Sequence, residues 1–145
     1  MSITGLDHVA LPAGQPLEML RFYRALGFQA PEPQAWQAAG TPYFAVQIGD
    51  QKINFHAPAL WQSASFTLRG PAAAPGCGDI CVVWSGALAE LRALLDRNGV
   101  AVEEGPVQRN GGRDGGRGAG ISLYVRDPDR NLLEFIVYGT PGDHA

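Results

Sequence analysis

Residues 121–138 read ISLYVRDPDRNLLEFIVY, two largely apolar runs around the sequence DPD at positions 127–129. Proline flanked by aspartates favours a turn, so the two runs are predicted to be strands that this turn joins. Side chains alternate between the two faces of a strand, and Leu133 and Phe135 therefore share one face. Glu134 lies on the opposite face, where an unpaired carboxylate in an apolar strand is costly. Glu134 is thus the first candidate functional residue.

The chain before this hairpin completes a unit of one strand, one helix and three strands. The expected strands are 79–84, 100–107, 121–126 and 132–138, and the helix carries the apolar stripe Leu88, Leu91 and Leu95. Ser85 is a candidate N-cap for that helix, and Asn98-Gly99 is its expected end.

The first half of the chain repeats this order. Strands are expected at 6–11, 43–48 and 52–56, with an irregular strand or edge in the Pro-rich passage 28–33. Apolar residues at 19, 22, 23 and 26 predict a helix that Gly27 ends. A repeat with a period of roughly 70 residues indicates a duplicated unit, and hence an α+β fold.

The 145 residues are expected to form one domain from two such modules. Module one covers about 3–57, a Pro- and Ala-rich linker about 58–77, and module two about 78–139. The modules could pair within one chain or between two chains. The Gly-rich stretch 110–120 is expected to be a mobile hairpin loop, for which a lid is one interpretation.

Composition excludes several classes of partner. The formal net charge of −3 provides no basic face for nucleic acid, and no apolar run approaches a membrane span. The first residues show no export signal, so the cytoplasm is the expected location. Cys77 and Cys81 would be too far apart for a disulfide if the chain between them is extended, and both are expected to stay reduced.

Four polar residues recur at matching places in the two halves. His8 and Asp79 lie near the start of the first strand of each half, and His56 and Glu134 lie on the last strand. Two imidazoles and two carboxylates suit a divalent Zn, Ni, Mn, Fe or Co ion. Ordinary readings stay open for each residue alone: either histidine could be a surface residue, and Asp79 could close a turn. Glu134 could also pair with an arginine such as Arg126.

Three segments together resemble the vicinal oxygen chelate superfamily. They are GLDHVAL at 5–11, FYRALGF at 22–28 and LYVRDPDRNLLE at 123–134. This superfamily contains glyoxalase I, fosfomycin- and bleomycin-resistance proteins and extradiol dioxygenases. The resemblance covers nearly the whole chain, and the segment QKINFH at 51–56 looks like an uncharacterised glyoxalase-like subgroup.

The resemblance implies paired βαβββ modules that form a curved mixed sheet, a cup with a metal inside, and usually a homodimer. It places His8, His56, Asp79 and Glu134 at the four ligand positions, and Tyr124 at a substrate-facing position. There are departures. Glyoxalase I generally has a carboxylate where His56 stands and a histidine where Asp79 stands, and extradiol dioxygenases need a histidine at the latter position.

Two main functions follow as hypotheses. The first is a metal-dependent lyase or isomerase for a small oxygenated substrate, with Glu134 as general base and Tyr124, Asn54 and Lys52 as substrate contacts. The second is a drug- or metabolite-binding module without catalysis, for which Trp36, Trp61 and Tyr43 are candidate wall residues. A dioxygenase and a purely structural dimer are further alternatives.

Overall fold

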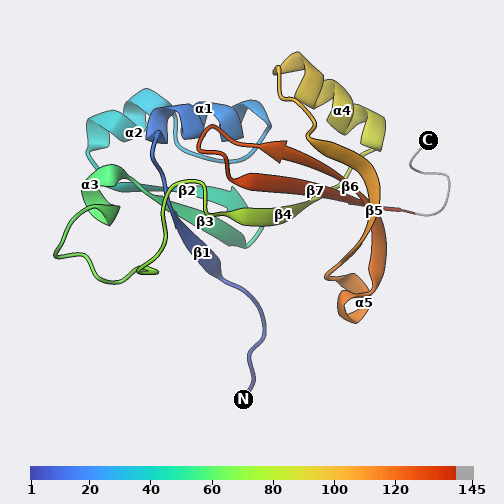
Figure 1. The fold of residues 1–145 in the computed structure, drawn as a ribbon, viewed down its shortest axis with the longest axis horizontal. Coiled ribbons are helices and arrows are strands. Elements are labelled where there is room, and N and C mark those ends of the chain that lie inside the picture. Colours follow the sequence, from blue (N-terminus) through green and yellow to red (C-terminus); the bar gives the residue numbers. More distant parts are fainter. Residues whose placement is uncertain (140–145) are drawn as a thin grey trace. The chain divides into compact units, whose positions relative to one another are not determined.

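The computed structural model describes residues 1–139. Contacts divide the chain into two compact units. The first comprises Met1–Gly78 together with Pro128–Arg130, and the second comprises Asp79–Asp127 together with the chain from Asn131 onward. Figure 1 labels the helices and strands of both units.

The first unit contains a three-stranded sheet with the strand order β1-β3-β2. Its elements are β1 (His8–Pro12), α1 (Pro16–Ala25), α2 (Pro33–Ala39), β2 (Tyr43–Ile48), β3 (Gln51–His56) and α3 (Pro58–Trp61). Strand β1 runs parallel to β3, and β2 runs antiparallel to it. The strands predicted at 6–11, 43–48 and 52–56 and the predicted first helix are therefore present within a few residues of their expected bounds.

The core of the first unit forms between α1 and one face of this sheet. The buried side chains of α1 are Met19, Leu20 and Tyr23, and those of β2 and β3 are Phe44, Val46, Ile53 and Phe55. The rings of Tyr23 and Phe55 lie 5.5 Å apart. Because strand residues alternate, burial of Ile53 and Phe55 turns Lys52, Asn54 and His56 to the opposite face.

The second strand expected in the first half is absent as a strand. A single bridge between Gln29 and Gln47 stands in its place, and helix α2 follows. Pro33 suits the first turn of a helix, where no N–H is needed, and the Glu32 carboxylate accepts a hydrogen bond from the Ala35 N–H at 2.9 Å. The irregular strand or edge predicted at 28–33 is thus reduced to this one bridge, because a helix begins at Pro33. The full βαβββ order occurs in the second unit only.

The second unit contains a four-stranded sheet with the order β4-β7-β6-β5. Its elements are β4 (Asp79–Trp84), α4 (Leu88–Arg97), β5 (Glu104–Gly111), α5 (Arg113–Gly116), β6 (Gly118–Arg126) and β7 (Leu132–Tyr138). The bounds predicted for β4 and β7 are confirmed. The predicted strand 100–107 was misplaced, because β5 pairs with β6 from Glu104 to Gly111, into the polar stretch read as loop.

Helix α4 covers the apolar face of the second sheet. Its predicted stripe of Leu88, Leu91 and Leu95 is buried, as are Leu123, Val125, Leu133, Phe135 and Val137 of the strands. The predicted N-cap was wrong: the helix is capped at Ala87, whose N–H donates to the Glu90 carboxylate at 3.0 Å. The opposite face of the sheet carries Glu134.

The turn between β6 and β7 is held by its own polar side chains. The buried Asp127 carboxylate accepts hydrogen bonds from the Asn131 N–H at 2.9 Å and from the Asn131 side-chain amide at 2.8 Å. In the first unit, Asp129 accepts a hydrogen bond from the Gly14 N–H at 2.7 Å. These contacts give the DPD turn of the sequence a structural role.

No helix within residues 1–139 is long and apolar enough to cross a membrane. Cys77 and Cys81 are both free thiols, as predicted.

Candidate functional site

The two predicted histidine ligands occupy different ends of one strand pair. His8 is in register with Lys52, and His56 is in register with Pro12. The two histidines are therefore four positions apart, about 13 Å along the strands. A divalent ion binds imidazole nitrogens at about 2 Å. The first unit thus does not bring His8 and His56 to one point.

The register also changes the correspondence between the two halves. Strands β1 and β3 are a parallel pair, as are β4 and β7. Asp79 is in register with Leu132, and Glu134 lies two positions further along β7. The residue two positions beyond the register partner of His8 is Asn54. Asn54, rather than His56, is therefore the equivalent of Glu134.

Asn54 has an unusual environment on the polar face of the first sheet. Its neighbours in register are Ala10 on β1 and Ala45 on β2, both with small side chains. Its side-chain oxygen Oδ1 is buried, yet it has no hydrogen-bond partner among residues 1–139. A buried polar atom without a partner is costly, so a ligand that donates a hydrogen bond or offers a cation would be favoured there.

His8 is held by its neighbour in the sequence. Its Nδ1 atom lies 2.5 Å from the Oδ1 atom of Asp7. This hydrogen bond, together with the charge of His8, lowers the pKa of Asp7. A carboxylate on Nδ1 leaves Nε2 as the remaining donor atom, which is the usual arrangement of metal-binding histidines. The surroundings of His8 therefore fit a ligand.

His56 is more enclosed. Its ring packs edge-on against Phe66, with 5.4 Å between the ring centroids. Burial lowers its pKa, and the positive charge of Arg69 lowers it further. His56 is therefore neutral at neutral pH, with its ring position set by packing in the first unit.

Glu134 is the centre of a polar cluster in the second unit, which we call the Glu134 cluster. Its members are Glu134, Ser122, Cys81, Tyr124 and Arg109. The fully buried Ser122 donates a hydrogen bond to Oε1 of Glu134 at 2.5 Å. Tyr124 and Cys81 are in register with Glu134 on the two neighbouring strands. The carboxylate thus has polar neighbours on both sides.

Cys81 stays protonated beside Glu134. Desolvation of the thiol raises its pKa to about 12, and the charge and hydrogen bond of Glu134 contribute to this. The residue as a whole is nevertheless exposed at the surface of the unit. A thiol with this pKa acts as a hydrogen-bond donor and not as a nucleophile.

Tyr124 and Arg109 bring a positive charge to the cluster. The Arg109 Nε–H donates to the Tyr124 hydroxyl at 3.0 Å, and Arg109 also lies 3.4 Å from Glu104. Desolvation and the Glu134 carboxylate raise the pKa of Tyr124, although the Arg109 hydrogen bond acts in the opposite direction. The tyrosine therefore remains a neutral hydroxyl, which accepts a hydrogen bond from Arg109 and lies beside Glu134.

Arg109 was missed by reasoning from the sequence. It falls in the part of β5 that was read as loop, beyond the predicted end of the strand at 107. Val107 of β5 is in register with Ser122, and Arg109 and Gly111 follow it at alternate positions on the same face of the strand. This period of two is the signal that could have identified Arg109. Arg126, the arginine suggested as a partner of Glu134, donates to Glu103 at 2.6 Å.

Asp79 and Glu134 share a face of the second sheet. Cys81 is in register with Glu134, and Asp79 lies two positions before Cys81 on the same face of β4. No group of three or more His, Cys, Asp or Glu side chains within residues 1–139 is arranged to hold a metal ion. His8, Asp79 and Glu134 have suitable donor atoms, whereas His56 is displaced from His8.

Comparisons with known proteins identify several similar proteins. No family model matches the chain. The glyoxalase domain-containing protein RDO1 of Mycosarcoma maydis is 32% identical over 138 residues, which cover 95% of this chain and 70% of that protein. The virulence protein STM3117 of Salmonella typhimurium is 32% identical over 139 residues, which cover 95% of this chain and 87% of that protein.

Several solved structures are also similar to this chain. The crystal structure of STM3117 has a TM-score of 0.77 and 30% identity, covering 96% of this chain and all (100%) of the other. Lactoylglutathione lyase from Agrobacterium tumefaciens has a TM-score of 0.67 at 18% identity, covering 94% of this chain and 95% of the other. A bleomycin resistance determinant encoded on transposon Tn5 has a TM-score of 0.54 at 22% identity. The match covers 93% of this chain and 98% of the other. At these lower identities the similarity concerns the fold alone.

Proposed function

This chain belongs to the glyoxalase and bleomycin-resistance proteins of the vicinal oxygen chelate superfamily, and on that premise we propose that it is a lyase or isomerase. Its substrate in this proposal is a small molecule with neighbouring oxygen atoms. The observation that carries the proposal is the Glu134 cluster, in which a carboxylate lies beside a tyrosine hydroxyl and an arginine.

The residues of the cluster have distinct roles in this proposal. Glu134 accepts a proton from the substrate and returns it to the product. Ser122 fixes one oxygen of that carboxylate, so the other can face the substrate. Arg109 stabilises the negative charge that proton removal leaves on the substrate, and Tyr124 donates a hydrogen bond to it.

Two residues of the first unit are proposed as substrate contacts. The buried Oδ1 of Asn54 lacks a partner within residues 1–139 and would accept a hydrogen bond from a substrate hydroxyl. Lys52 lies on the same face, two positions before Asn54, and would attract an anionic group. Both proposals agree with the polar character of this face.

The proposal includes one divalent metal ion, whose identity among Zn, Ni, Mn, Fe and Co is open. The predicted ligand set is His8, His56, Asp79 and Glu134. The Asp7–His8 hydrogen bond supports His8, and the shared face supports Asp79 and Glu134. For the ligand from β3, Asn54 competes with His56, because it occupies the place equivalent to Glu134. When bound, the ion would supply a Lewis acid for a developing oxyanion.

Turnover of a substrate panel tests the catalytic role. The panel contains small α-hydroxy ketones, hemithioacetals and epoxides, assayed with and without each metal. Glu134→Gln is expected to lower kcat by about 100-fold or more with little change in KM, since a general base typically contributes that much. Asp96→Asn on the exposed face of α4 is the matched control. Turnover that survives Glu134→Gln in a folded protein would refute the proposal.

A second candidate function is sequestration of an aromatic compound without turnover. Tyr43 favours it, because this residue is 46% exposed and shares the face of Asn54. The other predicted wall residues are fixed in the fold. The Trp36 indole donates to the Tyr43 carbonyl at 2.8 Å, and the Trp61 indole donates to the Ala13 carbonyl at 3.0 Å. Tight binding without turnover in the wild-type protein would support this candidate.

A cytoplasmic homodimer is also part of the proposal. Two free cysteines are typical of a reducing compartment. Strands β1 and β4 each form one edge of their own sheet, and edge strands offer hydrogen-bonding groups to a further strand. Sedimentation equilibrium should give twice the 15.4 kDa mass of one chain.

A further inference from the structure

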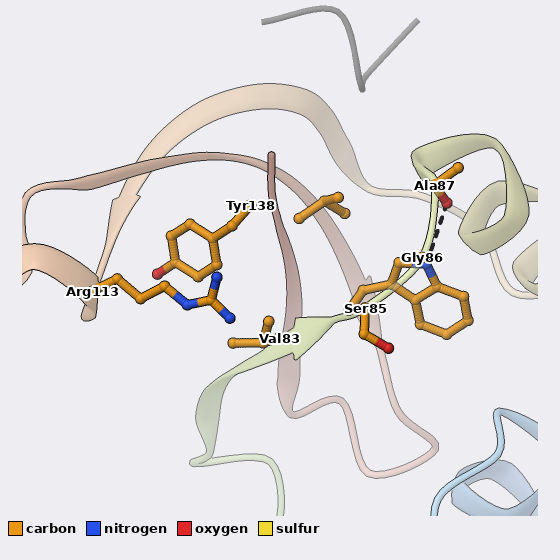
Figure 2. Close-up of a pocket in the computed structure, with 8 residues that line it drawn as sticks. Val83, Ser85, Gly86, Ala87, Arg113 and Tyr138 are labelled. Atoms are coloured by element: carbon orange, nitrogen blue, oxygen red, sulfur yellow. Dashed lines mark hydrogen bonds between the residues drawn. The ribbon is translucent and has the colours of Figure 1, made fainter. Parts of the chain in front are cut away.

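The second unit contains a pocket whose lining includes no residue of the Glu134 cluster, although Val83 and Tyr138 lie on the same face of the sheet as that cluster. It has a volume of about 470 Å³ and lies where β4 and β7 end, beside the loop that leads into α4. Tyr138, which lines it, lies four positions beyond Glu134 on β7, about 13 Å along the strand. Figure 2 shows Arg113 and Tyr138 on one side of the pocket and Ser85, Gly86 and Ala87 on the other, with Val83 between them.

One wall of the pocket combines a cation with an aromatic ring. The guanidinium carbon of Arg113 lies 4.2 Å from the centre of the Tyr138 ring, which is a favourable cation–π distance. Tyr138 packs against the backbone of β5, because a Cβ atom at Gly111 would overlap its hydroxyl. Within residues 1–139, no carboxylate lies within salt-bridge distance of Arg113. The guanidinium group of Arg113 is thus held over the Tyr138 ring, and its charge is available to an anionic ligand.

The rest of the lining combines aliphatic and aromatic side chains with the polar Ser85. Val83 contributes aliphatic surface and is 51% exposed, whereas Val137 is only 3% exposed and belongs mainly to the core under α4. Trp84 also lines the pocket, and its indole N–H donates to the Ala87 carbonyl at 3.2 Å, which fixes the ring. Aliphatic and aromatic walls favour a flat apolar group, and a pocket of this volume has the size of small-molecule sites.

From this combination we infer that the pocket binds a small aromatic carboxylate. The planar guanidinium group of Arg113 would bind the carboxylate group with two parallel hydrogen bonds. The aromatic part of the ligand would lie along Val83, between Tyr138 and Trp84. No residue of the Glu134 cluster lines this pocket, and the inference does not depend on the proposed reaction.

Calorimetric titration with 2-naphthoate tests the inference, with 2-naphthamide as the uncharged probe of the same shape. Arg113→Gln should weaken naphthoate binding about tenfold or more, a free-energy change of about 1.4 kcal/mol, and leave naphthamide binding unchanged. Arg117→Gln is the matched control, because Arg117 lies on the same hairpin but bonds to Asp114. Glu134→Gln should leave the naphthoate affinity unchanged.

Three results would overturn the inference. They are equal affinity for the amide and the carboxylate, equal losses in the two arginine variants, and loss of naphthoate binding in Glu134→Gln. Amide NMR spectra of the variants show whether each one is folded. In the wild-type protein, naphthoate should shift the Trp84 indole signal, assigned with Trp84→Phe, and the absence of such a shift would place the ligand elsewhere.

Discussion

Asn54 of β3 and Glu134 of β7 occupy equivalent positions in the two sheets. Each lies two positions beyond the register partner of the first-strand residue, His8 in one case and Asp79 in the other. Each points to the face opposite the helix-covered core. Both units therefore have a polar residue at this place, an amide in one and a carboxylate in the other.

This equivalence predicts which residues affect metal binding. His8→Ala and Asn54→Ala should each weaken divalent-ion binding by about tenfold or more, and His56→Ala should have a smaller effect, because it lies four positions from the register partner of His8. Metal content after dialysis, measured by mass spectrometry, checks the order of the three variants. If His56→Ala releases the ion and Asn54→Ala retains it, the ligand set predicted from the sequence holds in place of the equivalence.

The hydrogen bond between Ser122 and Glu134 leads to a stability prediction. Ser122 is fully buried and donates to the carboxylate at 2.5 Å. Ser122→Ala should lower the free energy of unfolding by about 1.5–3 kcal/mol, the usual range for a hydrogen bond to a charged group. Urea unfolding measures the change, and Ser65→Ala at an exposed site of the first unit serves as control. A change below about 0.5 kcal/mol would show that this hydrogen bond is not formed in solution.

Much of the second unit could be predicted from the sequence, because its signals are local. The short apolar run of residues 132–138, which only Glu134 interrupts, and the leucine spacing of α4 indicate each element and its buried face. The turn residues Asp127 and Asn131 give the hairpin, and their hydrogen bonds are within the same short segment.

Features that depend on pairing between distant segments could not be predicted. The register of β1 against β3 decides whether Asn54 or His56 is equivalent to Glu134, and no pattern within either strand contains that information. Arg109 belongs to the cluster because the pairing of β5 with β6 continues beyond Val107, the last apolar residue of β5. In the first half, the prolines at 31 and 33 are consistent with an edge strand or a helix start, and tertiary context favours the helix.

The raised pKa of Cys81 predicts an unreactive thiol. With a pKa of about 12, about one thiol in ten thousand is ionised at pH 8, and the thiolate is the reactive form. Iodoacetamide should therefore label Cys77 well before Cys81, as measured by peptide mass spectrometry. Glu134→Gln should accelerate labelling of Cys81, because the negative charge that raises its pKa is removed. Equal labelling rates in the wild type and the variant would contradict this role of Glu134.

The lowered pKa of His56 predicts a dependence of stability on pH. The folded protein disfavours protonation of this imidazole, so the unfolded chain binds more protons once the pH falls below the ordinary histidine value of 6.5. The stabilising effect of the neutral ring is present above pH 6.5 and is lost as the pH falls through the folded pKa. Between pH 7.5 and pH 5, the wild type should lose more stability than His56→Gln in urea titrations at each pH. Parallel curves for the two proteins would exclude His56 as the cause.

Gly76 should be intolerant of any side chain. Its φ angle is +88°, and a Cβ atom there would lie 2.6 Å from the backbone oxygen of Asp129, within the first unit. Gly49→Ala is the matched control, because Gly49 also has a positive φ, of 57°, but open space around its Cβ position. The control should cost about 1–2 kcal/mol from backbone strain alone. Gly76→Ala should cost clearly more, since backbone atoms must also move, and equal costs in thermal unfolding would show that the segment 74–78 adapts freely.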